Sequence, residues 1–134
     1  MFHSRRIATA CVGAIALLGV AACGGGDDEG DAEDTVREFT TALADKDGKK
    51  ACDQLAEDAK NQFEQSGQKC EDLLQLAFAS ISEEERNQLR DIEPDVSVDG
   101  DNATAKVPNI GEEGDSEIKL KKEDGDWKIS DLGG

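Results

Sequence analysis

Histidine and tyrosine are almost missing from this sequence. There is no tyrosine, and the single histidine is His3, near the start of the chain. Histidine is the usual base that activates a serine or cysteine nucleophile, and it is the commonest protein ligand of zinc. Carboxylates are numerous, but none falls in a recognisable acid–base pattern, and such catalysis needs a cleft and shifted pKa values. We therefore predict that the protein is not an enzyme and holds no metal or other cofactor.

Basic residues are also scarce. The chain has 15 Lys and Arg against 31 Asp and Glu, which gives a formal net charge of −16. Nucleic-acid binding depends on cations that displace counterions from phosphates, so we predict no nucleic-acid partner. A high net charge favours solubility and a monomer. Aromatic residues make up only 4% of the chain, so we expect a small and mostly aliphatic core.

Long hydrophobic runs are limited to one, in residues 7–22, which follows two arginines and ends in small residues. It is shorter than the roughly 20 residues of a comfortable transmembrane helix. This arrangement is typical of a signal peptide, and we assign residues 1–22 to one. The residues Val20-Ala21-Ala22-Cys23 resemble the lipobox of bacterial lipoproteins. The resemblance implies cleavage between Ala22 and Cys23, with a diacylglyceryl group on the Cys23 sulfur.

A lipid on Cys23 would anchor the protein to the outer face of the bacterial cell membrane. An ordinary secretory leader cut after Ala22 and an uncleaved anchor are the alternatives. The glycines and acids of residues 24–30 then read as a flexible acidic tether, so that residues 23–30 join the lipid to a domain over residues 31–134.

The first half of that domain has helical periodicity. Apolar residues spaced by three and four at Val36, Phe39 and Leu43 predict a helix that starts near Asp31 and ends at Asp47-Gly48. Similar spacing predicts a second helix over residues 51–63, a third over 70–81 and a short fourth over 82–89. The fourth begins with Ser82-Glu83-Glu84-Glu85, which is a capping box.

After Pro94 the hydrophobic period changes to two. A turn at Gly100-Asp101 would set Val98 opposite Ala103 and Val96 opposite Ala105. A turn at Asp124-Gly125 would set Leu120 opposite Ile129 and Lys122 opposite Trp127. Both registers place apolar residues on one face, and residues 108–115 form a loop between the hairpins. The predicted fold class is α+β, with N-terminal helices packed on a bent antiparallel β-meander.

The four cysteines divide into three kinds. Cys11 belongs to the signal peptide, and Cys23 is the lipidation site. Cys52 and Cys70 remain as a pair in an exported and oxidising setting, which predicts a disulfide. A metal or redox pair is the alternative, but the sequence offers no third ligand near them and no Cys-x-x-Cys motif.

Three further features need an interpretation. Trp127 could line a ligand pocket, although a lone tryptophan in a closing strand is more often part of a core. Residues 95–100 match the start of an EF-hand loop, but the twelfth position is Lys106 instead of the required glutamate. We read that segment as a strand and turn. One basic patch, a possible contact for an acidic partner, comprises Lys119, Lys121, Lys122 and Lys128.

The segments GQKCEDLL and KEDGDWKISDL, together with VSVDGDNATAKV, resemble small actinobacterial lipoproteins that have a nuclear-transport-factor-2-like fold. The resemblance covers about residues 31–132. It implies a cone, in which the N-terminal helices lie in the concave face of a strongly bent sheet. Enzymes of this fold place Asp, His or Tyr in the cone, and this chain has no His or Tyr to place there. We therefore carry over no catalytic residue.

These observations favour a lipid-anchored, non-catalytic binding or accessory module for a small ligand or an envelope protein. A passive structural surface lipoprotein and, less favoured, an enzyme with carboxylates in its cone are the alternatives. The membrane is the expected partner, through the N-terminal lipid. The candidate core or pocket residues are Phe39, Leu43, Phe63, Phe78 and Trp127.

Overall fold

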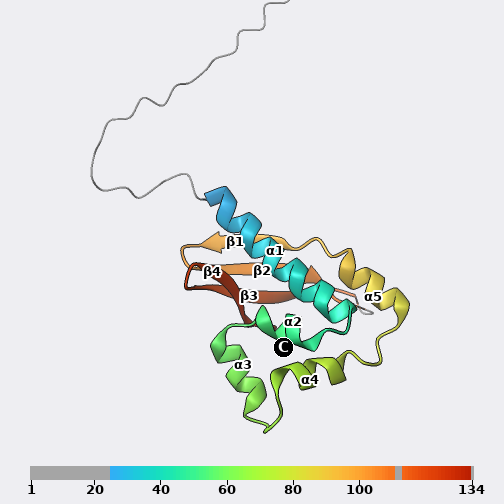
Figure 1. Cartoon of the computed structure of the whole chain (residues 1–134). Coiled ribbons are helices and arrows are strands. Elements are labelled where there is room, and N and C mark those ends of the chain that lie inside the picture. The colour runs from blue at the N-terminus through green and yellow to red at the C-terminus, as the bar shows by residue number, and fades with distance from the viewer. Residues whose placement is uncertain (1–24, 111–112, 134) are drawn as a thin grey trace, which may run out of the picture.

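The computed structural model describes residues 25–110 and 113–133 (Figure 1). The predicted signal peptide, its cleavage after Ala22 and the lipidation of Cys23 lie outside these residues. Within them, five helices precede four strands that form one antiparallel sheet in the order β1-β2-β3-β4. The predicted α+β class, helices first and an antiparallel meander second, is confirmed.

Helix α1, Gly25–Ala44, begins earlier and ends earlier than the sequence predicts. Residues 25–30 are helical, so the coil predicted there is wrong for the described part of the tether. Acidic side chains favour the positive end of the helix dipole, and Asp28 also pairs with Lys122 of the sheet at 2.5 Å. At the other end, Arg86 donates to the carbonyl of Ala44 at 2.6 Å, which satisfies one of the last carbonyls of the helix.

Gly48 does not end a helix as predicted but begins α2, Gly48–Asp53, behind Asp47, whose side chain accepts from the Lys50 N–H. The single helix predicted over 51–63 is also wrong, because it is two helices, α2 and α3, Glu57–Glu64. Residues 54–56 between them pair with the sheet. The Ala56 N–H donates to the Ile129 carbonyl at 2.7 Å, and the Ile129 N–H donates to the Gln54 carbonyl at 2.8 Å.

The last two helices are α4, Cys70–Ala77, and α5, Glu83–Arg90. Helix α4 is shorter than predicted because the chain turns after Ala77, although Phe78 and Ile81 still pack against the core. The predicted capping box of α5 is confirmed. Ser82 and Glu85 each accept a hydrogen bond from the other's backbone N–H.

The four strands are β1, Asp95–Asp99; β2, Asn102–Pro108; β3, Asp115–Glu123; and β4, Asp126–Asp131. Both predicted hairpin registers are confirmed, with Val98 opposite Ala103 and Leu120 opposite Ile129. The register shifts by one residue at the end of the second hairpin. Leu120 lies opposite Ile129 but Lys119 lies opposite Asp131, so β4 has one additional residue there, which is a β-bulge. The loop between the hairpins runs between Pro108 and Asp115, as predicted.

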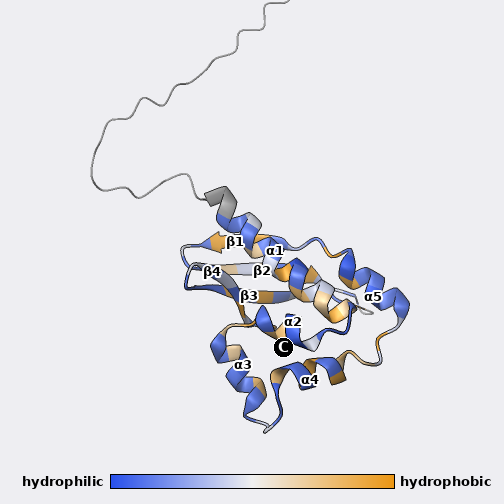
Figure 2. Ribbon diagram, viewed as in Figure 1, coloured by the Kyte–Doolittle hydropathy of each residue, from blue (hydrophilic) through white to orange (hydrophobic). Residues whose placement is uncertain are grey.

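The core lies between the helices and one face of the sheet. Each strand contributes its alternate apolar residues to that face, and α1 packs its buried residues against them. Figure 2 shows that α3 and α5 are largely hydrophilic, whereas apolar residues gather on α1, α4 and the strands. The opposite face of the sheet carries polar residues such as Thr104 and Lys106, a usual arrangement for an antiparallel sheet with one solvated face.

Candidate functional site

An apolar pocket opens between the helices and the sheet near the end of α1. It has a volume of about 290 Å³. Five elements contribute to it: the second half of α1, the ends of α4 and α5, and the strands β2 and β3 where they meet the 108–115 loop. Its lining residues are Phe39, Thr40, Leu43, Leu74, Phe78, Leu89, Ile92, Val107, Pro108, Asn109, Ile110, Ser116, Ile118 and Leu132.

None of the described residues that line this apolar pocket is titratable. The polar side chains among them are already engaged within the chain. The Thr40 hydroxyl donates to the Arg37 carbonyl at 3.1 Å, and the Ser116 hydroxyl donates to the Asn109 side-chain oxygen. The Asn109 amide also donates to the Glu113 carbonyl at 3.4 Å. The pocket therefore presents mostly hydrocarbon surface, and its polar side chains already have hydrogen-bond partners within the chain.

The sequence-predicted residues divide between this pocket and other places. Phe39, Leu43 and Phe78, three of the candidate core or pocket residues, line it together. Phe63 of α3 is half-buried and packs against the core without lining the pocket. Trp127 is buried in the core on β4, where its carbonyl accepts from the Thr35 hydroxyl at 3.2 Å. Trp127 therefore belongs to the core, and it also contributes to the wall of a separate polar hollow beside Thr35 and Lys128.

Sequence reasoning missed most of the rest of the pocket. Leu74 and Leu89 could have been predicted from the sequence, because both lie on the periodic apolar face of a predicted helix. Ile118 could also have been predicted, because apolar and polar residues alternate around it in β3. Ile92, Ile110 and Leu132 lie between or after the periodic segments, and only the folded arrangement brings them to the pocket.

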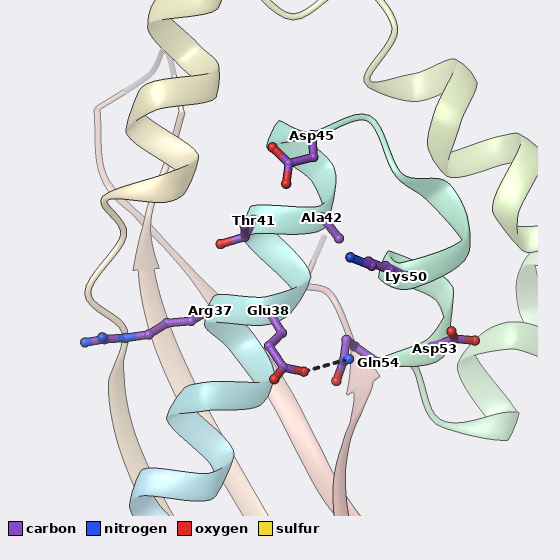
Figure 3. Close-up of a pocket in the computed structure, with 8 residues that line it drawn as sticks. All are labelled: Arg37, Glu38, Thr41, Ala42, Asp45, Lys50, Asp53 and Gln54. Carbon is purple, nitrogen blue, oxygen red and sulfur yellow. Dashed lines mark hydrogen bonds between the residues drawn. The ribbon is translucent and has the colours of Figure 1, made fainter.

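A larger polar groove of about 480 Å³ lies between α1 and α2 (Figure 3). Several of its polar groups are already paired, partly with residues that lie outside the groove. The Gln54 amide donates to Glu38 at 2.9 Å, Arg90 pairs with Asp45 at 2.7 Å, and Arg37 pairs with Glu33 at 2.5 Å. Figure 3 shows the Arg37 guanidinium directed away from the groove. We therefore take the apolar pocket, and not this groove, as the candidate site.

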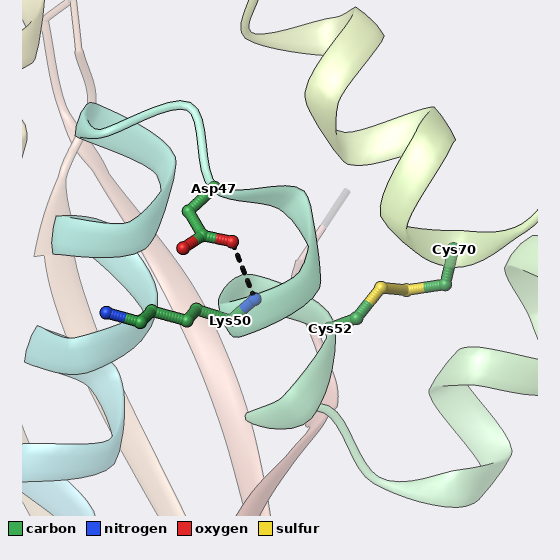
Figure 4. Close-up of a disulfide and its surroundings, with 4 residues drawn as sticks. All are labelled: Asp47, Lys50, Cys52 and Cys70. Carbon is green, nitrogen blue, oxygen red and sulfur yellow. Dashed lines mark hydrogen bonds between the residues drawn. A yellow bond between two sulfur atoms is a disulfide. The ribbon is translucent and has the colours of Figure 1, made fainter.

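Cys52 of α2 and Cys70 at the start of α4 are joined by a disulfide (Figure 4). Their Cα atoms are 6.1 Å apart, and both side chains are buried. A loop of this length contributes about 3 kcal/mol in the chain-entropy description of a disulfide. The bond holds α4 against α2, so it also holds Leu74 and Phe78 at the pocket.

The predicted basic patch is divided by the sheet. Lys122 is opposite Trp127 and lies on the side of α1, with its Nζ 5.3 Å from the indole centroid. Its hydrogen bond to Asp28 raises its pKa above the usual value, although desolvation opposes this. Lys121 donates to Asp58 at 2.6 Å, and this hydrogen bond raises the pKa of Lys121. Two of the four lysines therefore already have carboxylate partners.

The described part of the chain offers neither a metal centre nor a membrane span. Across residues 25–110 and 113–133, no three His, Cys, Asp or Glu side chains gather into a group that could hold a metal ion. In the same ranges, no helix combines the length and apolar character needed to cross a bilayer.

Fold and site together define an α+β domain, with helices on one face of an open antiparallel sheet and an uncharged apolar pocket between the two layers. The chain belongs to the family described as Domain of unknown function (DUF4878), which matches residues 21–130. The matched range includes Cys23, Cys52 and Cys70. No curated protein and no solved structure matches the chain.

Proposed function

We propose that this protein is a lipid-anchored, extracytoplasmic binding module that holds a small apolar ligand and does no chemistry of its own. The observation that carries the proposal is the apolar pocket. A binding site for such a ligand needs hydrocarbon walls with few polar groups, and the described lining contains no group that can act as an acid, a base or a cationic clamp. A carboxylate enzyme would need carboxylates at this place.

The size of the pocket sets the size of the ligand. A volume of about 290 Å³ accommodates about ten non-hydrogen atoms at roughly 30 Å³ each, which is the volume of one water molecule in the liquid. Each buried methylene contributes about 0.8 kcal/mol, and association itself costs several kcal/mol. We therefore expect a short alkyl chain or a single small ring to bind weakly, with a dissociation constant in the micromolar to millimolar range.

The signal peptide and lipidation of Cys23 are the second part of the proposal. They are supported by the basic start, the apolar run and the lipobox-like Val20-Ala21-Ala22-Cys23. Helix α1 begins at Gly25, two residues beyond Cys23. A helix rises 1.5 Å per residue, so Phe39 lies about 20 Å along α1 from its first residue. The pocket would then lie well away from the attachment point.

The finer fold assignment is also a proposal. We infer a nuclear-transport-factor-2-like cone, which is supported by the helices on one face of the meander, the bulge in β4 and a pocket between the two layers. Fold alone does not give the ligand.

A titration with 1-octanol, a neutral chain of about the right size, tests the binding proposal. The protein is the chain from residue 23 with Cys23→Ser, which keeps every described element and carries no lipid. We expect the methyl NMR signals of Ile118 and Leu74 to shift in a saturable way. Ile110→Asp places a charge in the pocket and should weaken binding at least tenfold.

Leu76→Asp is the matched control, because Leu76 is 70% exposed on α4 and does not line the pocket. It should leave the octanol affinity unchanged. Circular dichroism establishes that both variants are folded. The binding proposal is wrong if the methyl signals of the parent chain do not respond, or if the two aspartate variants lose affinity equally.

The anchor is tested in growing cells by labelling with an alkyne-bearing fatty acid. We expect the unaltered chain to take up the label and to fractionate with the membrane. The variant Cys23→Ser should lose the label. A parent chain that stays in the membrane without any label would contradict lipidation.

A further inference from the structure

A second hollow adjoins the apolar pocket. It has a volume of about 430 Å³ and lies between the end of α5, the following segment and the start of the 108–115 loop. The two hollows share four lining residues: Ile92, Pro108, Asn109 and Ile110. The two hollows therefore adjoin at these residues, and we call the second hollow the rim.

The rim differs from the apolar pocket in charge. It adds Gln88, Asp91 and Glu93 to the shared residues, and both carboxylates are exposed to solvent. No lysine or arginine is among its described lining residues. Arg90, which is close to Asp91 in the chain, instead pairs with Asp45 of α1 at 2.7 Å. The rim is therefore negative, and the adjoining apolar pocket is uncharged.

This arrangement selects among apolar ligands. A molecule whose alkyl chain fills the apolar pocket and whose other end reaches the rim has that end near Asp91 and Glu93. A cationic head there gains attraction from both carboxylates and from the net charge of −16, whereas an anionic head is repelled by both. Asn109 lies at the junction and lines both hollows.

We propose that the ligand of this pocket is a small amphiphile, a single short alkyl chain that ends in a cationic amine or ammonium head. This inference rests on the proposed binding function. The alkyl chain lies between Phe39, Phe78 and Ile118. The ammonium head stays partly hydrated at the rim, where Asp91 and Glu93 face it.

Three probes with the same octyl chain test the head group: octyltrimethylammonium, 1-octanol and octyl sulfate. They are titrated into the Cys23→Ser chain from residue 23, and the methyl signals of Ile118 and Leu74 report binding. We expect the cation to bind most tightly and the sulfate most weakly. Two exposed carboxylates correspond to a difference of about tenfold between cation and anion.

The double variant Asp91→Asn, Glu93→Gln should remove most of that difference and leave the octanol affinity unchanged. The control is Glu64→Gln, Asp72→Asn, which removes the same two charges from the exposed ends of α3 and α4, away from the rim. It should keep the preference for the cation. Measurements at about 0.15 M salt screen the long-range electrostatic effect of the net charge on the probes.

The outcomes distinguish the proposed binding of an apolar ligand from the proposed preference for a cationic head group. Equal affinity for all three probes overturns the cationic head and leaves the apolar pocket as a binding site. Loss of the preference in the control double variant shows that net charge, and not the rim, makes the selection, and this also overturns the inference. If none of the probes shifts the methyl signals, the proposed function fails and this inference fails with it.

Discussion

At the scale of single residues, a few backbone positions decide how the helices approach one another. Gly48 is the clearest case. A Cβ built on Gly48 would lie 2.1 Å from the carbonyl oxygen of Glu71, which is backbone of α4 and cannot rotate away. The glycine is therefore needed where α2 and α4 meet, next to the Cys52–Cys70 disulfide. Sequence patterns gave it another role, as a helix terminator, because a close approach between helices leaves no local signal.

Gly48→Ala should therefore lower the free energy of unfolding by about 1–3 kcal/mol, the range for an overpacked contact. Gly30→Ala is the matched control, because a Cβ there has nothing within 4 Å. Gly30 lies within α1, where alanine is the better helix former, so this change should raise stability by about 0.5–1 kcal/mol. Urea denaturation of both variants measures the difference, and equal effects would contradict the close approach of α2 and α4.

Ser82 is a second residue whose role can be tested, and here the sequence was sufficient. The capping box could be predicted because its donors and acceptors lie within four residues of one another. Ser82→Ala removes the N-cap acceptor of α5 and should lower the free energy of unfolding at pH 7 by about 1 kcal/mol. Ser80→Ala, an exposed residue of the preceding turn, should change it little.

The effect of Ser82 should also depend on pH. Hydrogen bonds from Ser82, first from its backbone N–H, lower the pKa of Glu85 below 4.5 in the folded chain. A carboxyl group whose pKa is lower in the folded chain than in the unfolded chain stabilises the fold at pH values above its unfolded pKa. This stabilisation is lost as the pH falls through the pKa of the folded chain. Stability curves between about pH 7 and pH 3 should therefore show the Glu85 contribution fading below its unfolded pKa. If the difference in the free energy of unfolding between Glu85→Gln and the parent chain does not change with pH, the capping box is contradicted.

At the scale of secondary-structure elements, local signals predicted the strands better than the helices. Turns at Gly100-Asp101 and Asp124-Gly125, together with alternating residues, settled both hairpin registers, because a shift of one residue would turn every apolar side chain outward. The break between α2 and α3 could not be predicted. Ala51, Leu55 and Ala59 have helical spacing, but Leu55 instead pairs with Ile129 at the free edge of β4. A tertiary hydrogen bond overrides the helical pattern there.

The start of α1 is a similar case. Glycines and acids in residues 25–30 have low helix propensity, which is why a coil was the natural prediction. The Asp28–Lys122 pair and the cation of Lys122 near the Trp127 ring hold this segment against the sheet. Helix formation there depends on a partner nearly a hundred residues away in the chain, which a pattern in a short window cannot reveal.

At the scale of the whole molecule, the proposed lipid and the apolar pocket lie toward opposite ends of α1. The beginning of α1 follows Cys23, where we propose the lipid. The apolar pocket and its acidic rim lie toward the other end of α1, so an anchored domain would present the pocket away from its attachment point. The pocket was only half predictable. Phe39, Leu43 and Phe78 came from periodic segments, whereas Ile92, Ile110 and Leu132 are gathered by the fold alone.

The most direct test of the central claim is to locate a bound probe. Intermolecular NOEs between the alkyl protons of 1-octanol and the Cys23→Ser chain from residue 23 would place the alkyl chain within the structure. We expect contacts to the rings of Phe39 and Phe78 and to the Ile118 methyl groups, with none to Trp127, which does not line the pocket. Contacts to Trp127 alone, or saturable binding without contacts to Phe78 and Ile118, would contradict the central claim.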